Sequence, residues 1–121
     1  MDTVEYLKAL ADETRLRIVS LLTQADTLCA CEVETVLGVN QSNLSRHLTR
    51  LKHAGVVHAV KSGQWVHYSL ARESAMHADL VSRAVEIARA ELPQLQTDAS
   101  RLEDYKASRF TCDTIKQWVA R

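Results

Sequence analysis

Apolar residues recur every three or four positions along most of the first 53 residues, the spacing that gives a helix one buried side. The pattern breaks at Asp12 and at Asn40, and each of these side chains can cap the helix that follows it. Gly38 is a typical residue just beyond a helix end. The sequence therefore predicts four helices in this part, over residues 2–11, 13–24, 30–37 and 41–53.

The period changes after Gly55. Residues 56–60 and 64–70 are rich in β-branched and aromatic side chains and are joined through Ser62 and Gly63, which predicts a β-hairpin. Helical spacing returns over residues 73–92 with a wide apolar stripe, and Pro93 is expected to end or kink that helix. Further amphipathic helices are predicted over residues 97–107 and 111–120. The predicted fold is mainly α with a small β-hairpin wing, in the order α-α-α-α-β-β-α plus a helical C-terminal tail.

Composition bounds the class of protein. The chain has 121 residues, 46% of them hydrophobic and 25% charged, which suits one soluble globular domain. Because it has neither an apolar run of membrane-spanning length nor the basic and apolar regions of a signal peptide, we expect it in the cytoplasm. There the three cysteines would remain thiols, which favours metal binding or redox chemistry over structural disulfides.

The short helix, the tight turn and the longer helix before the hairpin form the pattern of a winged helix-turn-helix. In this motif the second helix presents its N-terminal end to the major groove of DNA. Leu44, Leu48 and Leu51 share one side of that helix and are expected to face the core. The outward side chains are of the types that bind base edges and phosphates. We predict DNA contacts from Gln41, Ser42, Asn43, Ser45, Arg46 and Arg50, and a phosphate contact from Lys61 near the hairpin tip.

The charge distribution agrees with this interpretation. The formal net charge is zero, but residues 35–72 contain no Asp or Glu, so the region that would meet DNA is locally basic. The alternative is that Arg46, Arg50 and Lys52 only form a solvated helix face. The turn, the caps and the following hairpin together favour DNA binding. We expect double-stranded operator DNA as the partner, and neither RNA nor a membrane.

Several segments, in the right order and spacing, resemble the ArsR/SmtB (arsenic-repressor) family of winged-helix regulators. They are residues 10–18 (LADETRLRI), 45–48 (SRHL) with Leu51, 54–57 (AGVV) and 68–70 (YSL). The resemblance implies a transcriptional repressor that is a homodimer through its first helix and the long helix after the wing. We expect residues 1–92 to form the DNA-binding and dimerisation domain, and residues 93–121 a helical extension packed on it. Gln64 stands where family members often carry a basic wing residue.

Cys29 and Cys31 form a Cys-x-Cys segment that resembles the sensor of the family's arsenite and cadmium or lead responders. Soft thiolates select soft ions, and trivalent arsenic takes three sulfurs. The alternative is that both cysteines are small buried hydrophobic residues. The third cysteine of many arsenite responders is replaced here by Glu34. This leaves Cys112, either of the same subunit or reaching across the dimer, as the candidate third ligand, or as a packing residue. As(III) or Sb(III) is the expected inducer, bound by Cys29, Cys31 and Cys112.

Residues two apart point to nearly opposite sides of a regular helix. Either Cys29 therefore precedes the helix, or ligand binding unwinds its first turn and moves the recognition helix. His77 and Asp79 lack the partners that the family's zinc site on the long helix needs, so zinc sensing there is rejected. Cadmium or lead sensing and thiol-redox or sulfide sensing remain open alternatives. A thiol enzyme or metal buffer is a third possibility, but no catalytic motif is present and we expect no enzyme.

Overall fold

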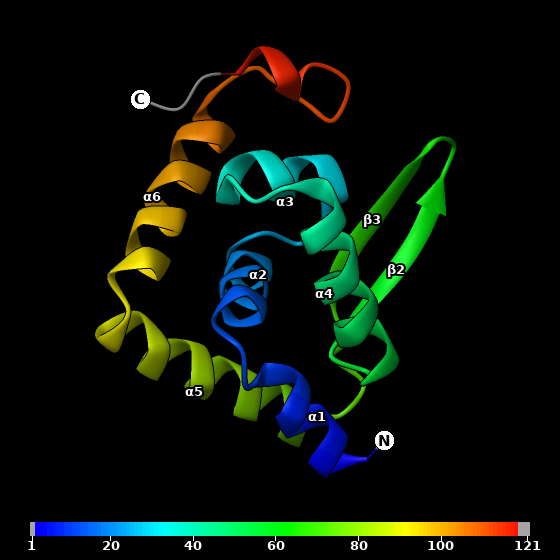
Figure 1. Ribbon diagram of the computed structural model, residues 1–121, viewed down its shortest axis with the longest axis vertical. Coiled ribbons are helices and arrows are strands. Elements are labelled where there is room, and N and C mark those ends of the chain that lie inside the picture. The colour runs from blue at the N-terminus through cyan, green and yellow to red at the C-terminus, as the bar shows by residue number, and fades with distance from the viewer. Residues whose placement is uncertain (1, 119–121) are drawn as a thin grey trace.

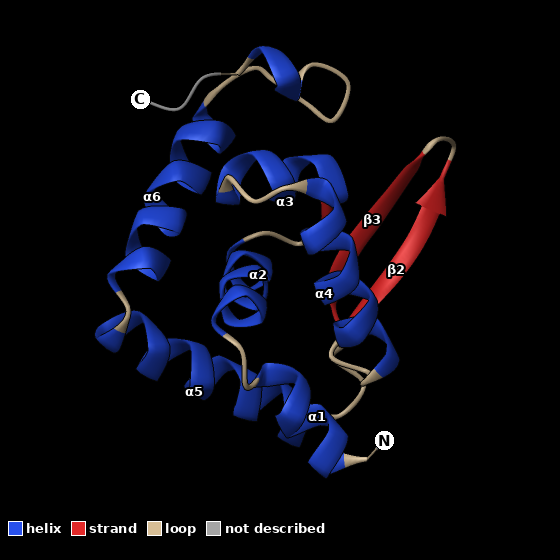
Figure 2. Cartoon of the chain, viewed as in Figure 1, coloured by secondary structure: helices blue, strands red, loops and turns tan. Residues whose placement is uncertain are grey.

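The computed structural model describes residues 2–118 and consists mainly of helices with one small sheet (Figures 1 and 2). The elements follow one another as α1 (Thr3–Leu10), α2 (Glu13–Gln24), β1 (Leu28–Cys29), α3 (Ala30–Leu37), α4 (Gln41–His53), β2 (Val57–Ser62), β3 (Trp65–Leu70), α5 (Ala75–Glu91), α6 (Pro93–Ala107) and the 3-10 helix η1 (Ile115–Gln117). None of the helices described is long and apolar enough to cross a membrane.

Helix boundaries in the first half follow the capping residues. The side chain of Asp12 accepts a hydrogen bond from the backbone N–H of Arg15, and that of Asn40 accepts one from Asn43. Gly38 ends α3 at φ 71°, in the left-handed region where a Cβ would be strained. The four helices predicted before the hairpin are therefore confirmed, and each of their ends lies within one residue of the predicted end.

Helix α2 lies at the centre of the molecule. Its residues Ile18, Val19, Leu21 and Leu22 are fully buried. In Figure 1, α5 and α6 enclose α2 on one side, and α3 and α4 pack on the other. The hairpin of β2 and β3 extends away from this helical body. This is the winged helix-turn-helix arrangement that the sequence predicted.

The sheet contains a strand that the sequence did not reveal. Strand β1 pairs antiparallel with β3, with Leu28 opposite Tyr68 and Cys29 opposite His67, and β3 also pairs with β2 in the hairpin. The strand order is therefore β1-β3-β2. Two residues are too short to produce an alternating pattern, so only pairing with β3 defines this strand. Its consequence is that Cys29 is tied to the wing.

The C-terminal part differs from the predicted helices in two ways. Pro93 does end α5, but it also occupies the first turn of α6, where its missing N–H costs nothing, so α6 begins four residues before the predicted Thr97. The prediction of a helix over residues 111–120 is wrong for the described part. Residues Thr111–Thr114 form a loop and turn, and only η1 is helical. The end of that predicted helix, residues 119–120, lies outside the described residues.

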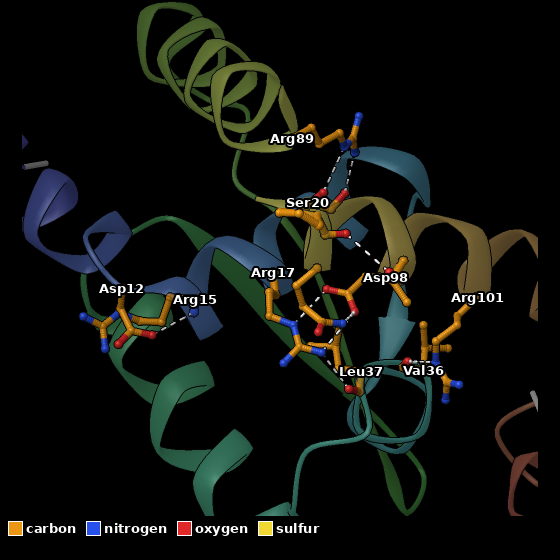
Figure 3. Close-up of polar contacts among 12 residues, drawn as sticks. Asp12, Arg15, Arg17, Ser20, Val36, Leu37, Arg89, Asp98 and Arg101 are labelled. Carbon is orange, nitrogen blue, oxygen red and sulfur yellow. Dashed lines mark hydrogen bonds and ion pairs between the residues drawn. The ribbon is translucent and has the colours of Figure 1, made fainter. Parts of the chain in front are cut away.

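Helix α6 is joined to the helical core by a buried ion pair (Figure 3). The guanidinium of Arg17 in α2 donates to both carboxylate oxygens of Asp98, at 2.8 and 3.0 Å, and Asp98 is fully buried. The helix also packs against α3 and α5. Through these contacts α6 returns the chain to α3, so that Cys112, which follows α6, lies beside Cys31.

Candidate metal centre and nucleic-acid interface

The three cysteines converge although Cys112 lies 81 residues after Cys31. Their sulfur atoms all lie within 4.8 Å of one another. Cys29 is the last residue of β1, Cys31 lies in the first turn of α3, and Cys112 lies in the loop between α6 and η1. Cys29 is buried and the other two are half-buried, and all three are free thiols. The structure therefore brings together the three residues that the sequence proposed as ligands.

The backbone at Cys29 explains how two cysteines two positions apart can share one site. Cys29 is the N-cap of α3 and has extended backbone angles, φ −78° and ψ 160°. Its sulfur lies 2.7 Å from the sulfur of Cys31. Of the two alternatives drawn from helix geometry, the one in which Cys29 precedes the helix is what the structure has. The sulfurs can therefore meet one ion without unwinding α3.

Glu32 connects the cysteines through its carboxylate. Oxygen Oε1 accepts hydrogen bonds from the backbone N–H of Cys29 at 2.8 Å and from the thiol of Cys112 at 3.2 Å. Oxygen Oε2 accepts the hydroxyl hydrogen of Tyr105 in α6 at 2.5 Å. The bond to Cys29 is one half of a capping box at the start of α3. One carboxylate thus links β1, α6 and the C-terminal loop.

Burial controls the protonation of the thiols. Loss of hydration raises the pKa of Cys29 to about 12, and burial also raises the pKa of Cys31 and of Cys112. At Cys112 the hydrogen bonds with Cys29 and Glu32 raise the pKa further. Burial alone would raise the pKa of Glu32, but the hydrogen bonds that it accepts, first the one from Tyr105, lower it overall. At neutral pH the site therefore holds three protonated thiols beside one carboxylate.

The spacing of the sulfurs fits a soft ion or metalloid. With metal–sulfur bonds of about 2.3 Å and bond angles of about 100°, two sulfurs on a centre with three bonds lie about 3.5 Å apart. The three sulfurs, all within 4.8 Å of one another, meet this condition after small side-chain movements. Binding by these residues stays a prediction, and the donor set is that of a thiophilic centre with three bonds.

Helix α4 exposes most of the residues predicted to bind DNA. Leu44, Leu48 and Leu51 are buried, as the apolar stripe requires. Of the other predicted residues on this helix, Asn43 and Arg50 are half-buried and the remainder are exposed, namely Gln41, Ser42, Ser45 and Arg46.

Two of these side chains have partners within the chain. The guanidinium of Arg46 donates to the side chain of Asn43 at 3.0 Å, and that of Arg50 reaches Glu5 of α1 at 3.4 Å. Lys61 is exposed on β2, close to the hairpin turn. The predicted DNA-binding residues therefore lie on α4 and on the wing, and contact with DNA stays a prediction for each of them.

A cavity of about 260 Å³ lies between α3, α4 and β3. Cys31 contributes to its wall from α3, Ser45 from α4 and Trp65 from β3. Trp65 also donates its indole N–H to Asp113, the neighbour of Cys112, at 3.2 Å. The cysteine cluster therefore borders both the recognition helix and the wing.

Known proteins are similar to this chain in sequence and fold. A sequence model described as "Bacterial regulatory protein, arsR family" matches residues 12–59. The arsenic resistance transcriptional regulator ArsR1 of Pseudomonas putida is 38% identical over 97 residues, which cover 80% of this chain and 74% of that regulator. The chain belongs to the arsR family of bacterial regulatory proteins. The family resemblance drawn from the sequence motifs is thereby confirmed.

Other relatives of this arsR-family chain align over shorter segments. The arsenical resistance operon repressor of Escherichia coli is 46% identical over 67 residues, covering 55% of this chain and 57% of that repressor. The cadmium resistance transcriptional regulatory protein CadC of Listeria innocua is 40% identical over 63 residues, covering 52% of this chain and 53% of CadC. The chain thus spans a little over half the length of these two relatives.

A solved structure supports the fold. The homodimeric winged helix-turn-helix DNA-binding domain of Mb0332 from Mycobacterium bovis, a possible ArsR-family regulator, superposes with a TM-score of 0.63 at 30% identity. The superposition covers 74% of this chain and 81% of that domain. The winged-helix architecture is therefore confirmed for this arsR-family protein.

Sequence reasoning missed Glu32 and Tyr105 as parts of the site. The position of Glu32, three residues after the N-cap Cys29, is the spacing of a capping box and could have indicated a role at the start of α3. No local signal marks Tyr105, because only the packing of α6 against α3 brings its hydroxyl to Glu32.

Proposed function

We propose that this arsR-family regulator is a homodimeric repressor that leaves its operator when As(III) or Sb(III) binds Cys29, Cys31 and Cys112. The observation that carries the proposal is the convergence of three free thiols within 4.8 Å, two of them at the start of the first helix of the helix-turn-helix. The number of thiols equals the number of bonds that trivalent arsenic or antimony forms with sulfur.

The comparisons support a metalloid inducer more than a divalent cation. The relative aligned over 97 residues and the repressor of E. coli are both named for arsenic resistance. CadC of L. innocua, named for cadmium resistance, keeps cadmium as the alternative. Trivalent arsenic gives an uncharged product with three thiols, whereas a divalent cation gives a negatively charged one next to the carboxylate of Glu32. Charge therefore favours the metalloid.

The signal has a short path to the DNA-binding surface. Because the structure requires no unwinding of α3, we infer that the ligand acts by drawing the loop that contains Cys112 toward the Cys29–Cys31 pair. That loop contacts the wing through Asp113 and Trp65. Cys31 also borders the cavity that Ser45 of α4 lines. A shift of the loop therefore displaces both the wing and the recognition helix. The loss of operator affinity is limited by how much more tightly the ligand binds the shifted state than the DNA-binding state.

The test is a titration of the protein on DNA from upstream of its own gene. Fluorescence anisotropy would follow release by arsenite, antimonite, cadmium, zinc and peroxide. We expect release by arsenite and antimonite, and Cys29→Ser and Cys31→Ser to keep DNA affinity but lose release. Cys112→Ser is expected to weaken release. Normal arsenite release from the Cys29→Ser, Cys31→Ser double variant would refute the site.

One observation favours a second candidate function. The sulfurs of Cys29 and Cys31 are 2.7 Å apart, so an oxidant such as peroxide could join two thiols of the cluster as a disulfide and form two water molecules. Release by peroxide without release by arsenite would replace the metalloid proposal with a thiol-redox sensor. Release by cadmium alone would assign the cysteines to a divalent cation.

A further inference from the structure

Two guanidinium groups close the C-terminal end of α3 (Figure 3). Arg101 of α6 donates to the carbonyl oxygens of Val36 and Thr35, at 2.6 and 3.0 Å. Arg17 of α2 donates to the carbonyl oxygen of Leu37 at 2.7 Å. The last carbonyls of a helix have no partner within it, so these bonds satisfy three groups that would otherwise need water. The last three residues of α3 are therefore held by α2 and α6.

The two arginines differ in how they are held. Arg17 is fixed by its ion pair with Asp98, whose carboxylate also accepts the side-chain amide of Gln94 at 3.0 Å. Arg101 instead faces the ring of Trp118, with 5.6 Å between the guanidinium carbon and the ring centroid. Arg17 therefore depends on the core, whereas Arg101 depends on the C-terminal segment.

The end of α3 decides where the recognition helix begins. Only Gly38, Val39 and Asn40 separate Leu37 from Gln41, the first residue of α4. A connection of three residues transmits a displacement of α3 almost directly to α4. The hold on residues 35–37 therefore also fixes the N-terminal end of α4.

A continuous set of contacts joins Arg101 to the cysteine cluster. The ring of Trp118 packs edge-on against that of Tyr105, with 5.5 Å between the centroids. Tyr105 donates its hydroxyl hydrogen to Glu32, which also accepts the thiol hydrogen of Cys112. When a ligand takes the sulfur of Cys112, the Cys112–Glu32 bond is lost. The change at Glu32 then passes through Tyr105 to Trp118, and the position of the Trp118 ring relative to Arg101 changes.

We propose that Arg101 is a positioning residue for α4. It holds the C-terminal end of α3 in the position that orients α4 for DNA binding, and it couples that position to the state of the cysteine cluster. The second half rests on the function proposed above. In this scheme the free site keeps Tyr105 and Trp118 packed beneath Arg101, and α4 stands ready for the groove. Ligand binding weakens the hold of Arg101, and the fraction of molecules with α4 in place falls.

The experiment compares Arg101→Ala with the wild type and with Lys106→Ala, which removes one positive charge from an exposed position of the same helix. Fluorescence anisotropy on the upstream DNA gives Kd at several salt concentrations, with and without arsenite. We expect Arg101→Ala to raise Kd at least about tenfold, because fewer molecules are competent to bind. The slope of log Kd against log salt should not change, since in this proposal Arg101 binds the carbonyls of α3 and not a phosphate. Lys106→Ala should match the wild type.

The coupling is measured as the ratio of Kd with arsenite to Kd without it. In Arg101→Ala this ratio should fall toward one while direct titration still shows arsenite binding. An unchanged Kd, a slope lower by about one, or a wild-type coupling ratio would each overturn the proposal. No arsenite response in the wild type would refute the proposed inducer and leave the Kd comparison valid.

Urea unfolding checks that Arg101→Ala is folded under the conditions used. If it is not folded, Arg101→Lys decides, because an ammonium group keeps the charge but lacks the planar fork that bonds two carbonyls. We expect a smaller rise in Kd for this variant than for alanine, and a reduced coupling ratio. Wild-type values for both quantities would overturn the proposal.

Discussion

At the scale of single residues, the three thiols hold their protons more firmly than cysteine in water. Burial raises the pKa of Cys29 to about 12 and raises the pKa of Cys31 and Cys112, so all three are protonated near neutral pH. Arsenous acid is uncharged there, and each of its hydroxyl groups leaves as water with one thiol proton. A divalent cation instead releases the thiol protons to solution.

This difference predicts opposite pH dependences. Arsenite affinity should stay nearly constant between about pH 6 and 8, because the exchange of three thiols for three hydroxyls has no net proton change. Cadmium affinity should rise with pH, by about tenfold per unit for each proton released, because the folded pKa values lie above that range. Calorimetry in buffers of different ionisation enthalpy measures the proton count. An arsenite affinity that falls tenfold per pH unit would show that one of the free thiols is already ionised, because the site would then take up a proton for a hydroxyl to leave as water.

At the scale of secondary-structure elements, α4 combines a buried leucine stripe with an exposed polar face. Its first turn is free of acidic residues and its last turn contains Arg50, Lys52 and His53. The guanidinium of Arg50 bonds to Glu5 of α1. Arg46 is exposed, and among the described residues its guanidinium has a hydrogen bond only with Asn43. Of the two arginines of α4, Arg46 is therefore the more available to a base edge or phosphate.

We predict that Arg46→Ala weakens operator binding by roughly 1–3 kcal/mol if the guanidinium binds a base, and that Arg50→Ala acts in the same direction. The measurement is anisotropy on the upstream DNA, with Lys106→Ala as the control for loss of one positive charge. The leucine stripe is untouched, so the free energy of unfolding should change little. If neither arginine variant alters Kd, α4 is not the recognition helix.

At the scale of the whole molecule, apolar side chains remain exposed on two helices that pack together. The exposed fraction is 58% for Val4 and 47% for Leu7 on α1, and 84% for Met76 and 60% for Ile87 on α5. Thr3 and Met76 also line one hollow that the two helices share. Apolar surface of this kind, on the helices through which the family resemblance implies dimerisation, is what a second copy of the chain would cover.

We predict a homodimer at micromolar concentration, with twice the mass of one chain by light scattering. Leu7→Glu should shift the population toward monomer and raise Kd for operator DNA, because one subunit contacts only half of a palindromic site. Val60→Glu is the matched control for the mass measurement only, since Val60 is 62% exposed and lies on the wing rather than on α1 or α5, but next to Lys61, the predicted phosphate contact. A wild-type mass of one chain would contradict the dimer, and a monomeric Val60→Glu would place the interface elsewhere.

The sequence by itself determined the helices before the hairpin and the chemistry of the cysteine pair, because both depend on interactions between residues close together in the chain. A capping side chain such as Asp12, a left-handed Gly38 and the leucine period of α4 all act within a few residues. Each of these signals can therefore be recognised from a short stretch of the sequence. The placement of the polar face of α4 follows from the same period.

Only the tertiary structure decided how the site is assembled. The pairing of β1 with β3 sets Cys29 in extended backbone, the packing of α6 brings Tyr105 to Glu32, and the loop after α6 brings Cys112 to the cluster. The prediction of a helix over residues 111–120 is wrong for the part that the structure describes, because residues 111–114 form a loop and turn that contact α3 through Cys31. These contacts join residues far apart in the chain, so their energy depends on how elements pack, and no periodicity or spacing records it.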